Sequence, residues 1–192
     1  MRKVTLDDLS GLARYASDRD RSRARIIEIK RDRRVAVGDR VTVVFENFDT
    51  IRFQVQEMVF VERITDIDEI RDECAIYNSL LPGDSELSAT LFVEVTEQER
   101  IADELNRLIG IDEHVVLSID GIDCPAKFEP GRTREDRISA VQYLRFPLPE
   151  SAAAALGRSR CPVSLRIDHP AYRAETVLSE AQRASLAGDM AG

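Results

Sequence analysis

The chain has 192 residues, of which 43% are hydrophobic and 32% are charged, a composition typical of globular proteins. No apolar run approaches the ~18 residues of a membrane-spanning helix, and the first residues lack the apolar core of a secretory signal. We therefore expect one domain over residues 1–192, located in the cytoplasm and not in a membrane, with a soft internal boundary near 82–86.

The net charge of −8 is spread unevenly along the chain. Residues 14–34 carry nine basic and four acidic side chains, so this segment has a net charge of +5 and the rest has −13. The acidic total argues against nucleic acid as a partner, as does the lack of aromatic residues between the basic ones. Two interpretations of the segment stay open: a solvated helix with ion pairs, or a docking surface for an acidic partner protein through Arg21, Arg23 and Arg25.

The three cysteines, Cys74, Cys124 and Cys161, are far apart and form no CxxC pair. This spacing argues against a zinc ribbon, a thioredoxin-type motif and a disulfide framework. Together with only two histidines, it also argues against a self-contained haem or iron–sulfur site. We expect no bound metal or cofactor, and we expect the cysteines to be small buried apolar side chains.

The first half of the chain is predicted to be mainly helical. Thr5 can cap one helix, and Ser17 or Asp18 can cap a second that ends near residue 31. Strands at 34–37 and 41–45 flank Gly38-Asp39, which predicts a β-hairpin with a two-residue turn. Residues 50–64 fit a helix with two apolar faces better than a strand, and another helix follows from Asp66 to the breaker at 80–83.

The second half is predicted to be rich in strands joined by short turns. Strands are expected at 87–95, 115–119, 122–124, 138–146, 163–167 and 172–178, and a loop at 129–137. Helices are expected after a capping box at 96–99, near 150–157 and after Ser179. Short turns favour antiparallel pairing, so we predict an α+β fold in which N-terminal helices and a β-hairpin pack with a mainly antiparallel, strand-rich C-terminal half.

Motifs of common nucleotide-binding, serine-hydrolase and zinc-protease sites are missing, which leaves two candidate places for chemistry. The first is the tract from Asp168 to Arg173. His169 could carry a proton or bind a ligand, Asp168 could orient its ring, and Tyr172 and Arg173 could contact the ligand. The same residues also fit a structural β-turn led by Pro170.

The second place is Glu57, with its neighbour Gln56. In a helix over 50–64, Glu57 shares a face with Phe53 and Phe60, so its carboxylate must be paired, be protonated or reach water. Its partner could be an arginine, His169 or a metal. An alternative function is therefore a small ligand-binding protein or enzyme with a pocket near Glu57 and His169, in which Arg173 clamps an anion.

Several separated blocks also stand out: DRRVAVG at 32–38, IRFQVQEM at 51–58, YN at 77–78, LIGI at 108–111 and DHPAYR at 168–173. In this order they resemble a bacterial family of unknown function, the DUF family numbered 3501. The resemblance carries no catalytic residues, but it implies an accessory role beside redox or peroxide-defence proteins, such as rubrerythrin-like and iron–sulfur proteins. Our leading hypothesis is a non-enzymatic accessory protein that engages such partners through its basic segment.

Overall fold

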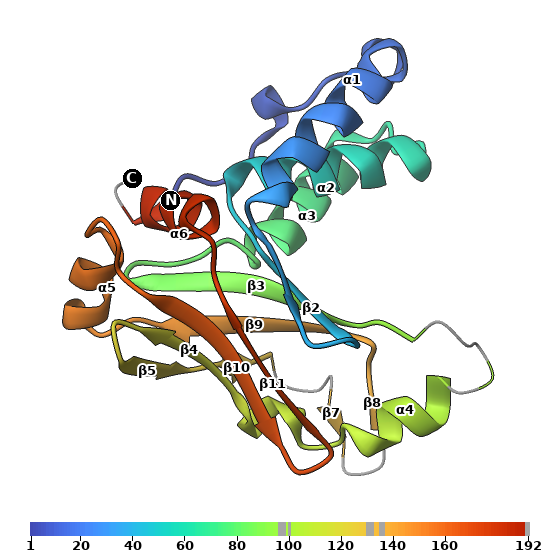
Figure 1. Cartoon of the computed structure of the whole chain (residues 1–192). Coiled ribbons are helices and arrows are strands. Elements are labelled where there is room, and N and C mark those ends of the chain that lie inside the picture. The colour runs from blue at the N-terminus through green and yellow to red at the C-terminus, as the bar shows by residue number, and fades with distance from the viewer. Residues whose placement is uncertain (96–98, 100, 130–132, 135–136, 191–192) are drawn as a thin grey trace.

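The strands form antiparallel ladders within an α+β fold, as the sequence predicted. The computed structural model describes residues 1–95, 99, 101–129, 133–134 and 137–190 (Figure 1). One sheet has the strand order β1-β2-β3-β9-β6, and the other has the order β11-β10-β4-β5.

The first sheet contains β1 (Arg34–Val37), β2 (Val41–Phe45), β3 (Glu86–Val93), β9 (Val141–Pro147) and β6 (Lys127–Phe128). The second contains β11 (Tyr172–Val177), β10 (Val163–His169), β4 (Val115–Ile119) and β5 (Ile122–Pro125). Apolar side chains on the facing surfaces, such as Val43, Leu91, Leu117 and Leu165, belong to one buried cluster. The two sheets therefore pack face to face around the main core.

The sheets are also connected along both sides. On one side, β5 and β6 follow each other across Ala126, so the chain passes from one sheet into the other. On the other side, the Tyr172 hydroxyl donates to the Val37 carbonyl at 2.6 Å and the Thr176 hydroxyl to the Ala36 carbonyl at 2.6 Å. These side chains satisfy the free edge of β1, which gives the sandwich the character of a flattened barrel.

Three helices lie together on one side of the molecule, near the end of β2 and the start of β3 (Figure 1). They are α1 (Leu12–Arg31), α2 (Phe48–Val61) and α3 (Ile67–Asn78), preceded by the 3-10 turn η1 (Leu6–Asp8). One apolar face of α2, with Ile51, Val55 and Val59, is buried in a second, smaller cluster with Cys74 of α3. Asn47 caps α2, and Asp66 caps α3 as predicted.

Thr5 caps η1 as predicted, in a capping box with Asp8. The predicted start of a second helix at Ser17 or Asp18 is wrong, because α1 runs unbroken through both residues. The Ser17 hydroxyl donates to the Arg14 carbonyl at 2.7 Å, and the Asp18 carboxylate pairs with Arg21 at 2.6 Å. Both side chains thus bond within the continuing helix, and neither caps a new one. The predicted hairpin turn also differs, because Val37 pairs with Val41 and leaves three residues between the strands.

The remaining elements are α4 (Ile101–Arg107), η3 (Ile111–Glu113), α5 (Glu150–Leu156), α6 (Glu180–Asp189), β7 (Thr133–Arg134) and β8 (Arg137–Ile138). Ser179 caps α6 in the capping box that the sequence predicted. The loop predicted at 129–137 is wrong in part, since β7 pairs with β8. Most of the capping box predicted at 96–99 lies outside the described residues. None of the helices described is long and apolar enough to cross a membrane.

Candidate functional site

The Glu57 carboxylate lies between α1 and α2. It accepts a hydrogen bond from the Tyr15 hydroxyl at 2.7 Å. It also accepts two hydrogen bonds from Arg19, at 2.9 Å from Nε and 2.8 Å from Nη2. Hydrogen bonding from Arg19 lowers the pKa of Glu57, so the carboxylate stays charged. The Arg19 guanidinium also lies 4.9 Å from the centre of the Phe60 ring. Of the three partners considered for Glu57, the structure shows an arginine.

His169 ends β10 and points inward. Its Nδ1 accepts the Ala171 amide at 3.2 Å, and its Nε2 lies 3.0 Å from the Ile109 carbonyl, which places the proton on Nε2. Its ring stacks edge-on against His114, with 5.2 Å between the ring centres. Both ring nitrogens are therefore used to fix the turn and the segment before β4.

Neighbouring side chains of the tract from Asp168 to Arg173 point to opposite faces of the β10–β11 hairpin. Asp168 and Arg173 are cross-strand partners, and their exposed side chains pair with each other at 2.9 Å. Tyr172 is buried, donates to Val37 and accepts the Arg40 amide at 3.1 Å. The tract thus forms a turn with one outer ion pair and two inner anchoring side chains.

The structure does not bring Glu57 and His169 together. All described contacts of the Glu57 carboxylate come from α1, whereas those of His169 come from residues 109–114 and its own turn. In Figure 1, α2 and the β10–β11 turn lie at opposite ends of the molecule. The pocket predicted near both residues is therefore not formed, because α1 and not the sheet covers the Glu57 face of α2.

A groove between α1 and α2, of about 400 Å³, gathers arginines instead. We call it the basic groove; its charged lining residues are Arg14, Asp18, Arg21 and Arg25 of α1 with Asp49 and Arg52 of α2, a net charge of +2. Gln56 also lines it and holds the backbone of Ser10 through two hydrogen bonds, of 2.6 and 3.0 Å. Arg23 is exposed but is not part of this lining.

The arginines of the basic groove remain available to a partner. The side chains of Arg21 and Arg25 are 82% and 67% exposed, and their ion pairs reach Asp18 at 2.6 Å and Asp49 at 4.0 Å. Such exposed pairs contribute ~0–1 kcal/mol each, so a bound anion could replace them at little cost. Of the residues of α1, only Tyr15 and Ile26 are buried, which leaves most of this helix facing solvent.

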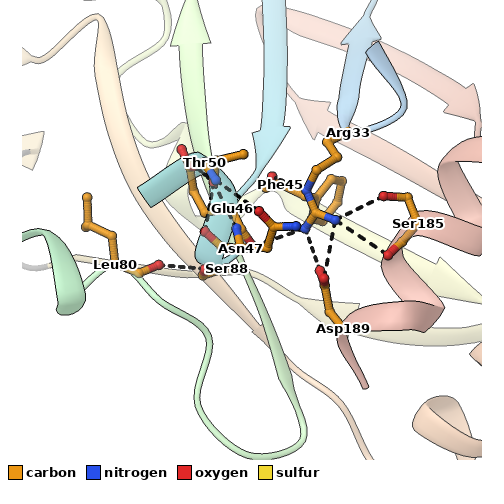
Figure 2. Close-up of polar contacts among 9 residues, drawn as sticks. All are labelled: Arg33, Phe45, Glu46, Asn47, Thr50, Leu80, Ser88, Ser185 and Asp189. Atoms are coloured by element: carbon orange, nitrogen blue, oxygen red, sulfur yellow. Dashed lines mark hydrogen bonds and ion pairs between the residues drawn. The ribbon is translucent and has the colours of Figure 1, made fainter. Parts of the chain in front are cut away.

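Sequence reasoning missed a second polar cluster, which is buried around Arg33 and Glu46 (Figure 2). Arg33 is 1% exposed, donates to the carbonyls of Phe45 and Glu46 at 2.8 and 3.1 Å, and forms an ion pair with Asp189 of α6. Glu46 is 3% exposed, and its carboxylate accepts hydrogen bonds from the hydroxyl groups of Thr50 and Thr90. A sequence signal was present, because both charged residues directly adjoin short apolar strands.

One family model matches almost the whole chain. The model of the family described as "Protein of unknown function (DUF3501)" matches residues 3–190. The chain belongs to this family. It is also similar to a crystal structure of a novel protein of unknown function from Burkholderia pseudomallei K96243, with a TM-score of 0.92 and 35% identity, covering 98% of this chain and 100% of that one. No curated protein matches the sequence.

Within the described residues, no three His, Cys, Asp or Glu side chains gather where they could hold a metal ion. Cys74, Cys124 and Cys161 are buried as free thiols, and burial raises the pKa of each. Buried thiols of raised pKa are poor nucleophiles, so these three behave as apolar core side chains.

Replacing Glu57 with glutamine is expected to lower the free energy of unfolding by about 1–2 kcal/mol, because Arg19 and Tyr15 lose a charged acceptor. Urea unfolding and amide hydrogen exchange along α1 measure the effect, with the exposed Glu62→Gln as the matched control. Because the folded pKa of Glu57 is lowered, its contribution is present above the unfolded pKa of roughly 4.3 and is lost as pH falls through the folded pKa. A deficit that persists unchanged at low pH would contradict this assignment.

Proposed function

We propose that this DUF3501 protein is a non-enzymatic accessory protein that docks an acidic partner protein on its basic groove. The observation that carries the proposal is the convergence of Arg14, Arg21, Arg25 and Arg52 in one groove of a chain whose net charge is −8. A local positive surface on an acidic protein steers acidic partners toward that surface.

The exposure of α1 supports the same proposal. Because few of its side chains are buried, the helix contributes less to the core than its 20 residues could. Its binding role would explain why so much of its surface is charged and solvated. The resemblance adds the class of partner: redox or peroxide-defence proteins, such as rubrerythrin-like and iron–sulfur proteins, which would bring their own cofactors.

Reversing three charges of the basic groove tests the proposal. We expect Arg21→Glu, Arg25→Glu and Arg52→Glu together to weaken partner capture about tenfold or more, because attraction becomes repulsion. The measurement is a pulldown from the native organism with mass spectrometry, repeated at rising salt. Raised salt should release the wild-type partner, since screening shortens the range of exposed charges.

The matched control carries the same change in total charge elsewhere. Arg71, Arg166 and Arg173 each form ion pairs outside the basic groove, so their reversal should leave capture intact. Arg23→Glu alone tests the other flank of α1 and should have the smaller effect. Full capture by the triple variant of the groove would overturn the proposal, and equal loss in the control would reduce it to a general effect of net charge.

A further inference from the structure

A second cavity, separate from the basic groove, lies on the face of the five-stranded sheet that points away from the main core. Its volume is about 190 Å³, and it is lined by Glu46 after β2, Thr90 of β3, Tyr143 of β9, Lys127 and Phe128 of β6, and Leu80 after α3. We call it the outer-sheet cavity. In strands β3 and β9, the side chains of Thr90 and Tyr143 alternate with the core residues Leu91 and Leu144.

The inner end of this cavity holds the buried carboxyl group of Glu46, which has no cation beside it in the described part of the chain. Glu46 Oε2 accepts the Thr50 hydroxyl at 2.5 Å and the Gln54 amide at 3.1 Å, while Oε1 accepts the Thr90 hydroxyl at 2.6 Å. All three donors are neutral, and Glu46 forms no ion pair with any residue that the structure describes. Of the groups of Glu46, the Arg33 guanidinium bonds only the backbone carbonyl. The ion pair of Arg33 is with Asp189 (Figure 2).

This arrangement leaves room for one more donor. A carboxylate oxygen can accept about two hydrogen bonds, and Oε1 accepts one from Thr90, whose residue lines the same cavity. A carboxylate in a medium of low dielectric is stabilised by a cation within hydrogen-bond distance, and the neutral donors around Glu46 do not supply one. An ammonium group of a ligand placed beside Oε1 and Thr90 would supply it.

The lining of the cavity also includes two basic residues, Lys127 and Arg145, and a second acidic residue, Glu129. Lys127 is exposed on β6 and, within the described part of the chain, has no ion-pair partner. Arg145, which also lines the cavity, is bonded to Glu86 and to the Ser79 carbonyl. Leu80 and Phe128 add apolar surface to the lining.

We propose that the outer-sheet cavity binds a small zwitterion, with its ammonium group on Glu46 and Thr90 and its carboxylate on Lys127. The volume of about 190 Å³ lies below the ~300–1,000 Å³ of pockets for larger ligands, so the ligand is of the size of an amino acid. The inference is independent of docking on the basic groove, because the two sites share no lining residue.

Isothermal titration calorimetry with a panel of probes tests this site. The probes are straight-chain ω-amino acids of increasing length, with monoamines, diamines and monocarboxylates of the same lengths. The wild-type protein should bind an amino acid of one preferred length, and Glu46→Gln should weaken that binding about tenfold or more. Thermal unfolding of each variant reports whether its fold is retained.

Variants at Lys127 keep the test valid even if Glu46→Gln fails to fold, because Lys127 is exposed. Lys127→Met should abolish the preference for the amino acid over the monoamine of the same length. Lys127→Glu should invert selectivity, so that the diamine binds best. The proposal is overturned if no probe binds the wild-type protein at millimolar concentration, if monocarboxylates bind best, or if the Lys127 variants keep wild-type selectivity.

Discussion

Replacing Arg33 with methionine is expected to lower the free energy of unfolding by about 3–5 kcal/mol, because it leaves the buried Asp189 carboxylate without its cation. The guanidinium is 1% exposed and bonds the carbonyls of Phe45 and Glu46, the Ser185 hydroxyl and Asp189. One side chain thus fastens the C-terminal helix α6 to the junction of β2 and α2. Urea unfolding followed by circular dichroism measures the loss.

The neighbouring Arg34→Met is the matched control, because Arg34 is exposed and its pair with Glu94 spans 3.5 Å. That variant should change stability by less than about 0.5 kcal/mol. The double variant Arg33→Met with Asp189→Leu should recover much of the loss, since apolar groups of similar volume can replace a buried pair. If the double variant is as unstable as Arg33→Met alone, the cost comes from the backbone bonds of Arg33 and not from an unpaired carboxylate.

The loss in Arg33→Met should also depend on pH. Burial already raises the pKa of Asp189, and Arg33 opposes this effect. Without the cation, the folded pKa rises further, so the folded state binds a proton more tightly than the unfolded state does. Stability of the variant should therefore increase as pH falls from neutral, and the difference from wild type should shrink. A difference that stays constant with pH would show that Asp189 is not the unpaired charge.

Much of the fold could be predicted because its signals are local. Asp66 and Ser179 cap helices that they immediately precede, and the Asp120-Gly121 turn joins strands that pair directly. The wrong prediction of a helix start at Ser17 or Asp18 also has a local cause. Ser17 and Asp18 have the side chains of helix caps, but within α1 they find partners one turn away, so the helix continues.

The sites could be predicted less well, because they depend on which element covers which face. Periodicity placed Glu57 on an apolar face of α2 but could not show that α1 covers that face. The basic segment was visible in the sequence, yet the basic groove also needs Arg52 from another helix. Ser88 and Thr90 had the alternation of a strand with one solvated face, and the structure buries both beside Glu46.

Replacing Gly38 with alanine is expected to lower the free energy of unfolding by about 2–5 kcal/mol. The loss combines backbone strain at a positive φ with steric overlap between the new Cβ and Tyr172. Gly38 has φ +73°, a region that costs an L-residue roughly 1–2 kcal/mol. A Cβ there would overlap the Tyr172 hydroxyl and lie 3.0 Å from the Ala174 Cβ. The hydroxyl that would have to move joins β11 to the edge of β1, so the connection between the two sheets would weaken.

Gly121 separates the two causes, because it has φ +79° and a Cβ added to it would meet nothing within 4 Å. Gly121→Ala should therefore show the backbone strain alone, about 1–2 kcal/mol in urea unfolding. Tyr172→Phe removes the overlapping oxygen, so Gly38→Ala should cost less in that background than in the wild type. Equal losses at Gly38 and Gly121, with no coupling to Tyr172, would contradict the close approach of β11 to the hairpin. A larger loss at Gly38 that shrinks with Tyr172→Phe would place the connection between the sheets at this one hydroxyl.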